Sequence, residues 1–195
     1  MQIRCKKTDL LNSVNISLRA VTSKTTLPIL ECIVIEAQDN IIKLISNNQE
    51  LGIETIVKGE IIENGSIAIN AKLFSEIIRK LPDSDVTFTT NASFMANIQC
   101  EKAKFNLMGK ASDEFPLLPT VETDKSIRVS DFALKEIIHQ TIFSVSDNES
   151  NKIMTGELFE IKGDIFKVVS LDGHRISIRN VQLKEDYPDH KVIVP

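Results

Sequence analysis

The sequence predicts an α+β fold in which repeated domains place helices on one side of antiparallel sheets. Short runs of alternating apolar and polar residues, typical of half-buried strands, recur along the chain with turn signals between them. Two longer stretches, which begin near Thr8 and Asn70, carry apolar residues at helical spacing instead. The pattern of residues 3–50 starts again at residue 127, and this repetition predicts two related domains.

Composition limits the class of protein. A chain of 195 residues with 42% hydrophobic residues can form one large or two small globular domains. It contains no apolar run near the length of a membrane-spanning helix, and its start lacks the apolar core of a secretory signal. The three cysteines have no metal-ligand spacing, which favours reduced thiols, so a cytoplasmic location without membrane contact is expected. The formal net charge of −4 argues against a simple basic nucleic-acid binder, but a local basic stripe is compatible with it.

The first part of the chain is predicted to form a short strand at residues 3–5, a helix and three more strands. Thr8 is a plausible helix N-cap, because its hydroxyl can accept a hydrogen bond from a free N–H of the first turn. The opposite face of this helix is polar and almost uncharged, and Pro28 marks the loop after it. The apolar residues at helical spacing are Leu10, Val14, Leu18 and Val21, and the strands are expected at 33–37, 41–46 and 51–57.

A second helix is predicted to begin after Asn70, another favoured N-cap residue, and to end at Pro82. A connector of mixed charge follows at 109–123 and is typical of an inter-domain segment. The apolar stripe of the helix is expected to contain Leu73, Phe74, Ile77, Ile78 and Leu81, with strands at 67–69, 86–90, 94–98 and 104–107 around it.

An internal repeat relates the two parts of the chain. Residues 3–50 align without gaps to residues 127–174, at an offset of 124, so that Leu10 meets Leu134. The alignment predicts two copies of one strand, helix and sheet unit, with a slip of register near residue 51. We therefore expect a complete domain at 1–122 and, at 123–195, the N-terminal half of a second one.

The sequence carries no signature of an enzyme. It lacks the glycine-rich phosphate-binding loops GxxxxGK[ST] and GxGxxG. It also lacks paired Cys and His residues at the spacing of zinc ligands. We therefore expect no catalytic residue, no metal site and no cofactor.

The most distinctive stretch is 168–177, VVSLDGHRIS. Asp172 and Gly173 predict a turn between two strands, and His174 and Arg175 leave that turn at the edge of a sheet. One interpretation is a solvated hairpin tip. Another is a hydrolase with Asp172 and His174 as acid/base partners, although no motif places a Ser or Cys nucleophile beside them.

The segment Asp172-Gly-His-Arg-Ile176 also resembles a known family, the bacterial β sliding clamps of DNA polymerase III. The segments 26–30 (TLPIL), 113–116 (DEFP) and 158–160 (LFE) agree with it in order and spacing. The resemblance covers Met1 to Pro195, where the family continues for roughly as many residues again, so it implies an N-terminal half. It also implies the clamp fold, in which helices line the inside of a ring and sheets form the outside.

The function implied by the resemblance is that of a non-enzymatic processivity factor in DNA replication. Such a clamp closes as a homodimer ring around double-stranded DNA without reading its sequence. DNA polymerase and clamp-loader subunits bind a groove on it through short linear motifs. The alternative is a protein-interaction scaffold that uses the same groove and has no role on DNA.

Three sets of residues are expected to carry this function. Sliding needs cations that attract phosphates without reading bases, and the exposed helix faces supply Arg19 and Arg79. The resemblance adds further DNA-contacting positions and the other two sets. The DNA-contacting residues are then Arg19, Lys24, Lys72, Arg79, Asn148, Lys152 and Ile153; the partner groove is Met154, Leu171, Gly173, His174, Arg175 and Ile176; and the ring interface, on an edge strand at 102–107, is Lys102, Lys104, Phe105 and Leu107.

Overall fold

The computed structural model describes residues 1–22, 25–116, 118, 126–148, 150–151 and 153–195. The chain divides into two compact units, Met1–Thr120 and Val121–Pro195, called unit 1 and unit 2 below. In the described residues, no helix is both long and apolar enough to cross a membrane.

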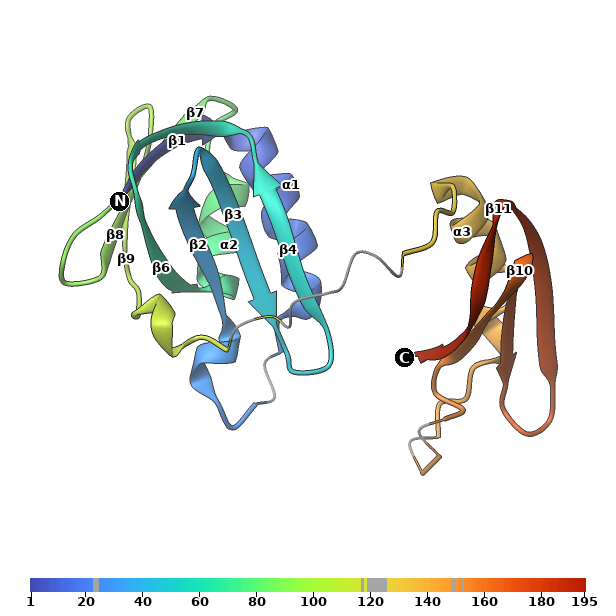
Figure 1. Cartoon of the computed structure of the whole chain (residues 1–195). Helices are drawn as coiled ribbons and strands as arrows, with labels where there is room; N and C mark the ends of the chain where they lie inside the picture. The colour runs from blue at the N-terminus through green and yellow to red at the C-terminus, as the bar shows by residue number, and fades with distance from the viewer. Residues whose placement is uncertain (23–24, 117, 119–125, 149, 152) are drawn as a thin grey trace. The chain divides into compact units, whose positions relative to one another are not determined.

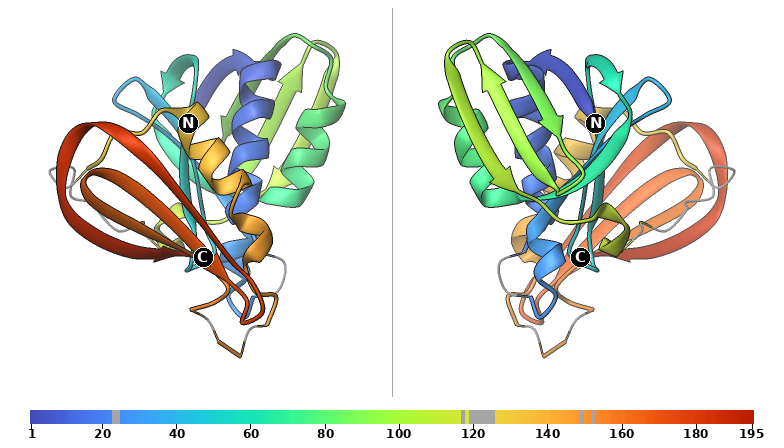
Figure 2. Two further views of the ribbon diagram at one scale, coloured as in Figure 1. Left: turned by 90° about the vertical axis from the view of Figure 1, so that its right-hand side faces the viewer. Right: turned by 90° about the vertical axis from the view of Figure 1, so that its left-hand side faces the viewer.

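Unit 1 consists of two antiparallel sheets and two helices (Figure 1). One sheet has the strand order β5-β1-β7-β8-β9 and the other the order β4-β3-β2-β6. Helices α1 and α2 lie side by side and pack against the sheets (Figure 2). The elements are β1 (Gln2–Lys6), α1 (Lys7–Ser17), β2 (Cys32–Gln38), β3 (Ile41–Asn47), β4 (Gly52–Val57), β5 (Gly59–Glu63), β6 (Gly65–Asn70), α2 (Ala71–Lys80), β7 (Asp85–Thr90), β8 (Met95–Cys100) and β9 (Ala103–Met108), with short 3-10 turns at Leu18–Ala20, Pro28–Glu31 and Ser112–Glu114.

The two halves of unit 1 interlock through their first strands. Strand β1 precedes α1 but pairs with β7, which follows α2. Strand β6 precedes α2 but pairs with β2, which follows α1. One apolar core therefore joins both helices and both sheets, with Leu10 and Val14 from α1, Phe74 and Ile78 from α2, and Phe88 from β7.

The two helices begin for different reasons. Asn70 caps α2 as predicted, because its Oδ1 accepts a hydrogen bond from the Leu73 N–H at 3.1 Å. The prediction that Thr8 caps α1 is wrong, since the helix already begins at Lys7. The Lys7 N–H donates to the Ser84 carbonyl at 3.1 Å, so a distant segment satisfies this end of the helix.

Two further expectations for unit 1 are corrected. Leu73 is 51% exposed and does not belong to the buried stripe of α2. Strand β5 was not predicted, because its sequence GEIIE has no alternating pattern. It forms because β1 provides an edge, on which Ile61 pairs with Ile3.

Unit 2 contains one helix and two long strands that bend back on themselves. The elements are α3 (Asp131–His139), a 3-10 turn at Ile142–Ser144, β10 (Glu157–Leu171) and β11 (Ile176–Val194). Lys167 Nζ lies 3.2 Å from Glu160 Oε2, whereas seven residues of straight strand would span about 23 Å. The bend is at Gly163, whose φ is +58°. Strand β11 pairs with both arms of β10, as Figure 2 shows, and α3 covers one face of the resulting layer.

The structures of the two units repeat at the offset found in the sequence. Ser46 pairs with Ile53 in unit 1, and Ser170 pairs with Ser177 in unit 2. Ser46 Oγ donates to the Ser17 carbonyl, and Ser170 Oγ donates to the Thr141 carbonyl, 124 residues on in both partners. The same β-sheet contacts therefore recur, as the sequence predicted.

The expected slip of register near residue 51 is wrong. The ladder keeps the offset of 124 through the pairs Ile42–Val57 and Phe166–Val181. The apparent slip arises because β11 carries apolar residues on its exposed positions, where Ile176 is 60% and Ile178 is 55% exposed. Apolar residues on a solvent face mark a candidate binding surface.

Glu160 makes unit 2 sensitive to acid. Its nearly buried carboxylate lies 2.8 Å from the Nζ of Lys191, 3.2 Å from that of Lys167 and 3.5 Å from that of Lys162. Hydrogen bonds from Lys191 and Lys167 lower the pKa of Glu160 from 4.5 to about 2. Because the pKa is lower in the folded than in the unfolded chain, the stabilisation is complete above about pH 4.5 and is lost as the pH falls towards 2.

We expect Glu160→Gln to lower the stability of unit 2 near neutral pH, and the difference from the unchanged protein to shrink as the pH falls from about 4.5 to about 2. Urea unfolding followed by tyrosine fluorescence reports on unit 2, because Tyr187 is the one tyrosine and the chain has no tryptophan. A stability difference that stays constant over this pH range would contradict the role of Glu160.

Candidate functional sites

The exposed face of the two helices in unit 1 carries polar and basic side chains. On α1 and the turn after it, Asn12, Asn15 and Arg19 are exposed and spaced by three and four residues, as on one side of a helix. On α2, Lys72 and Arg79 are exposed two turns apart. Arg79 Nη2 donates to Asn15 Oδ1 at 3.5 Å and joins the two helices. These five residues form one surface, called the helix face below.

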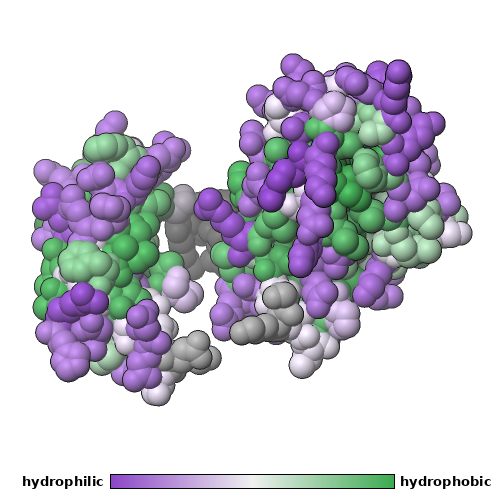
Figure 3. All heavy atoms as spheres, turned by 180° about the vertical axis from the view of Figure 1, so that it is seen from behind, coloured by the Kyte–Doolittle hydropathy of each residue, from purple (hydrophilic) through white to green (hydrophobic). Residues whose placement is uncertain are grey.

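The helix face is open to solvent and mixed in character. Figure 3 views unit 1 from the side of α1 and α2, with hydrophilic side chains standing out and apolar ones exposed between them. Leu73 and Ile16 are among these exposed apolar residues. Glu76 lies between Lys72 and Lys80 on α2, so positive charge exceeds negative charge on this helix surface. Such a surface attracts an anionic polymer without offering a shaped pocket for one base.

The other predicted DNA-contacting residues lie in loops. Lys24 and Lys152 lie outside the described residues. Asn148 is exposed, and its Oδ1 accepts a hydrogen bond from the Ser150 N–H at 3.0 Å, which shapes the loop. Ile153 is largely exposed. The structure therefore joins Arg19, Lys72 and Arg79 on one face and leaves Asn148 and Ile153 on a separate loop of unit 2.

The predicted ring interface lies on β9, the last strand of the five-stranded sheet, which pairs with β8. Phe105 pairs with Ile98 and Leu107 with Ala96, and both partners are buried, so these side chains share the inner face of the sheet. Phe105 is nevertheless 38% exposed, because it lies at the sheet edge. Lys104 is exposed on the outer face. Lys102 was expected in this strand, but it lies in the turn before it.

The predicted partner groove is centred on the turn between β10 and β11. Asp172 Oδ1 accepts the backbone N–H groups of His174 and Arg175, both at 3.0 Å. Asp172 Oδ2 accepts from Arg175 Nε at 2.8 Å. These bonds, that from the His174 backbone first, lower the pKa of Asp172. The carboxylate therefore builds the turn, and its bond to His174 involves the backbone, not the imidazole ring that a hydrolase would use.

An exposed apolar surface adjoins this turn. Leu171 is half-buried, and Ile176, Gly173, His174 and Arg175 are exposed. Met154 is half-buried in the preceding loop, where its carbonyl accepts the Ser146 N–H at 2.9 Å. The turn and strand positions named from the sequence thus lie together, and Met154 is placed on a separate loop.

Phe143 belongs to this surface but was missed in the sequence. Its ring is 58% exposed, and Arg175 Cζ lies 5.9 Å from the ring centroid. The hydroxyls of Ser144 and Ser177 are 2.6 Å apart and fasten the 3-10 turn of Phe143 to β11. Phe143 and Arg175 are 32 positions apart in the chain, so no local pattern could reveal their contact. We call Phe143, Leu171, Arg175, Ile176 and Ile178 the tip surface.

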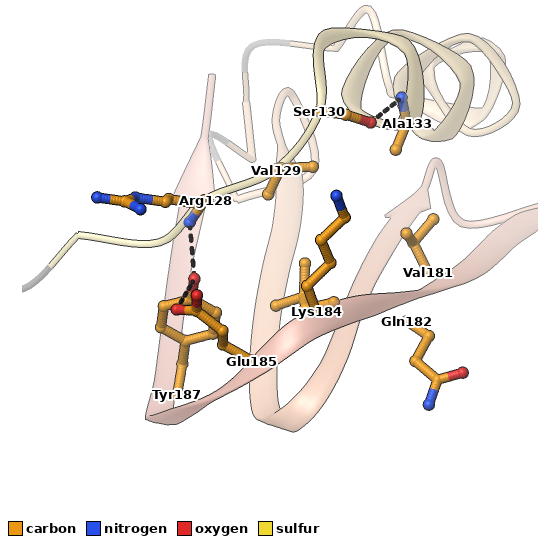
Figure 4. A pocket seen from close by; sticks show the side chains of 10 residues that line it. Arg128, Val129, Ser130, Ala133, Val181, Gln182, Lys184, Glu185 and Tyr187 are labelled. Atoms are coloured by element: carbon orange, nitrogen blue, oxygen red, sulfur yellow. Dashed lines mark hydrogen bonds between the residues drawn. The ribbon is translucent and has the colours of Figure 1, made fainter.

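A cavity of about 400 Å³ in unit 2 has a structural explanation (Figure 4). It lies between residues 128–130 and β11, where the Tyr187 hydroxyl accepts the Arg128 N–H at 3.2 Å and donates to Glu185 Oε2 at 3.3 Å. In unit 1, the residues 124 positions earlier form the β1–β5 ladder, with Arg4 opposite Glu60. The cavity thus occupies the place of a strand pairing. Within the described ranges, no cluster of three or more His, Cys, Asp or Glu side chains could hold a metal.

Comparison with known proteins places both units in one family. Residues 1–119 match the family described as DNA polymerase III beta subunit, N-terminal domain, and residues 128–195 match its central domain. The beta sliding clamp of Staphylococcus epidermidis is 36% identical over 203 residues, which cover 100% of this chain and 54% of the relative. The chain therefore spans about half the length of the curated relatives that it matches.

Solved structures agree with this result. A putative DNA polymerase III beta subunit from Eubacterium rectale is 58% identical with a TM-score of 0.96, covering 100% of this chain and 53% of that one. The DNA polymerase sliding clamp from Bacillus subtilis is 32% identical with a TM-score of 0.95, covering 100% and 54%. The predicted α+β clamp fold is confirmed. This chain belongs to the family of DNA polymerase III β subunits, the bacterial sliding clamps.

Proposed function

We propose that this chain is part of a sliding clamp, a non-catalytic processivity factor that encircles duplex DNA and holds the replicative polymerase on it. The observation that carries the proposal is the helix face, on which Arg79 bridges to Asn15 and aligns with Lys72 and Arg19. Cations on a rigid and unshaped surface attract phosphates of any sequence, as sliding requires. The names of the relatives from S. epidermidis and B. subtilis support the same role.

In this proposal the chain supplies a first clamp domain at 1–122 and the N-terminal half of a second at 123–195. The DNA-contacting residues are those of the helix face together with Lys24, Asn148, Lys152 and Ile153. Strand β9 closes a homodimer ring through Phe105 and Leu107, with Lys102 and Lys104 beside them. An edge strand with apolar anchors and flanking lysines suits selective pairing with one partner and discourages self-pairing.

The tip surface and Met154 form part of a groove for short linear motifs of polymerase and clamp-loader subunits. Support comes from its exposed apolar residues beside a turn fixed by Asp172. A groove that combines Met154 with leucine and isoleucine side chains can accept several related motifs. The scaffold alternative keeps this groove and assigns no role to the helix face.

The DNA role is tested by charge reversal on the helix face of the full-length clamp. Arg79→Glu is expected to shorten retention on nicked circular DNA and to reduce the slope of log affinity against log salt by about one, because a phosphate contact is lost. Retention on circular and linearised DNA is measured at several salt concentrations. As a surface change, the substitution should alter stability by no more than about 0.5 kcal/mol.

Lys110→Glu is the matched control. Lys110 is exposed and its backbone bonds to Ala68, which belongs to a small cluster separate from the core beneath the helices. It should leave retention unchanged. Equal retention of the Arg79→Glu and unchanged clamps, with peptide binding at the tip surface intact, would favour the scaffold over the clamp.

A further inference from the structure

The turn of the tip surface has a structural twin in unit 1. Asn48 Oδ1 accepts the N–H groups of Glu50 at 3.0 Å and Leu51 at 2.7 Å, as Asp172 Oδ1 accepts those of His174 and Arg175, 124 residues later. The φ of Gln49 is +76° and that of Gly173 is +90°. The twin folds with a neutral amide in place of the Asp172 carboxylate and with a leucine in place of Arg175. The charged pair in unit 2 is therefore more than the turn needs in order to form.

The additional interactions in unit 2 all converge on Arg175. Its Nε is held by Asp172 Oδ2 at 2.8 Å, and its Cζ lies 5.9 Å from the centroid of the Phe143 ring. The Ser144–Ser177 contact keeps the Phe143 turn next to the strand that begins after Arg175. The long arginine side chain is thus fixed from two sides, although 57% of it is exposed.

The chemistry of this fixed guanidinium favours an aromatic ligand. Asp172 already compensates its charge and occupies Nε, so a carboxylate of a partner gains little there. A guanidinium is weakly hydrated, and its flat faces stack on aromatic rings. Ile176, 60% exposed, provides an apolar neighbour for the same ligand.

We propose that Asp172 and Phe143 are positioning residues that hold Arg175 as a flat wall, and that this wall stacks against an aromatic side chain of the partner peptide. The inference rests on the proposed partner groove and adds the class of side chain that one part of it recognises.

The test compares two peptide amides that contain one glutamine and two leucines and differ in one residue. One carries phenylalanine and the other cyclohexylalanine, which has a similar shape but no π electrons. NMR titration of the 195-residue chain should give a preference of about 2- to 5-fold for phenylalanine. Asp172→Asn, which copies the twin turn, and Phe143→Leu should each reduce the preference towards 1, whereas Phe143→Tyr should retain it.

Phe132→Leu is the control, because Phe132 is an exposed aromatic residue on α3 and is not part of the tip surface. It should keep the full preference. If both peptides bind with equal affinity, or if Phe143→Leu keeps the preference, the inference is wrong and the groove stands. If neither peptide binds at millimolar concentration, the proposed groove is wrong and the inference falls with it.

Discussion

Replacing Phe105 with Asp is expected to prevent the full-length clamp from staying on circular DNA while unit 1 remains folded. Phe105 lies on the apolar face of the edge strand β9 and is 38% exposed, so the monomer tolerates a polar group there. In a closed ring the new carboxylate would be buried without a partner, which costs several kcal/mol. A ring built head to tail opens when its repeated interface fails. We expect roughly a hundredfold or greater loss of retention.

Asn106→Asp provides a control with the same charge on the same strand. Asn106 pairs with Asn97 on the outer face, where its Oδ1 accepts the Asn97 Nδ2 at 2.7 Å, and a carboxylate can accept the same bond. Light scattering should give a dimer for this variant and a monomer for Phe105→Asp. Retention of a Phe105→Asp dimer on nicked circular DNA would show that β9 does not close the ring.

Replacing Phe74 with Ala is expected to destabilise unit 1 by about 3–5 kcal/mol. The side chain is fully buried on α2, and its ring lies 6.1 Å from that of Phe88 in an edge-to-face arrangement. Truncation removes this contact and leaves a cavity where the helix meets the sheet. Urea unfolding followed by far-UV circular dichroism measures the loss.

Leu73→Ala, at the neighbouring position, controls for the change in helix sequence. Leu73 is 51% exposed, so its truncation should cost well under half as much as that of Phe74. Equal losses for the two variants would mean that α2 packs with a different face against the sheet. The comparison therefore tests the orientation of the helix that carries Lys72 and Arg79.

The sequence by itself determined the features that depend on local spacing. Alternation and helical periodicity predicted the α+β class, and Asn70 predicted the start of α2, because a cap acts on a backbone N–H within one turn. The offset of 124 predicted the repeated unit, and the hydrogen bonds of Ser46 and Ser170 recur at it. The segment 172–176 pointed to the correct family because its residues act together within one turn.

Only the tertiary structure decided the features that depend on groups distant in the chain. Helix α1 begins before Thr8 because the Ser84 carbonyl receives the Lys7 N–H. Ile176 and Ile178 suggested a slipped register because a sequence does not show which face of a strand is open to solvent. Phe143 joined the tip surface through its contact with Arg175 across the fold. Burial and long-range contacts arise only when the strands pair and the helices pack, so these residues could not be assigned before the fold was known.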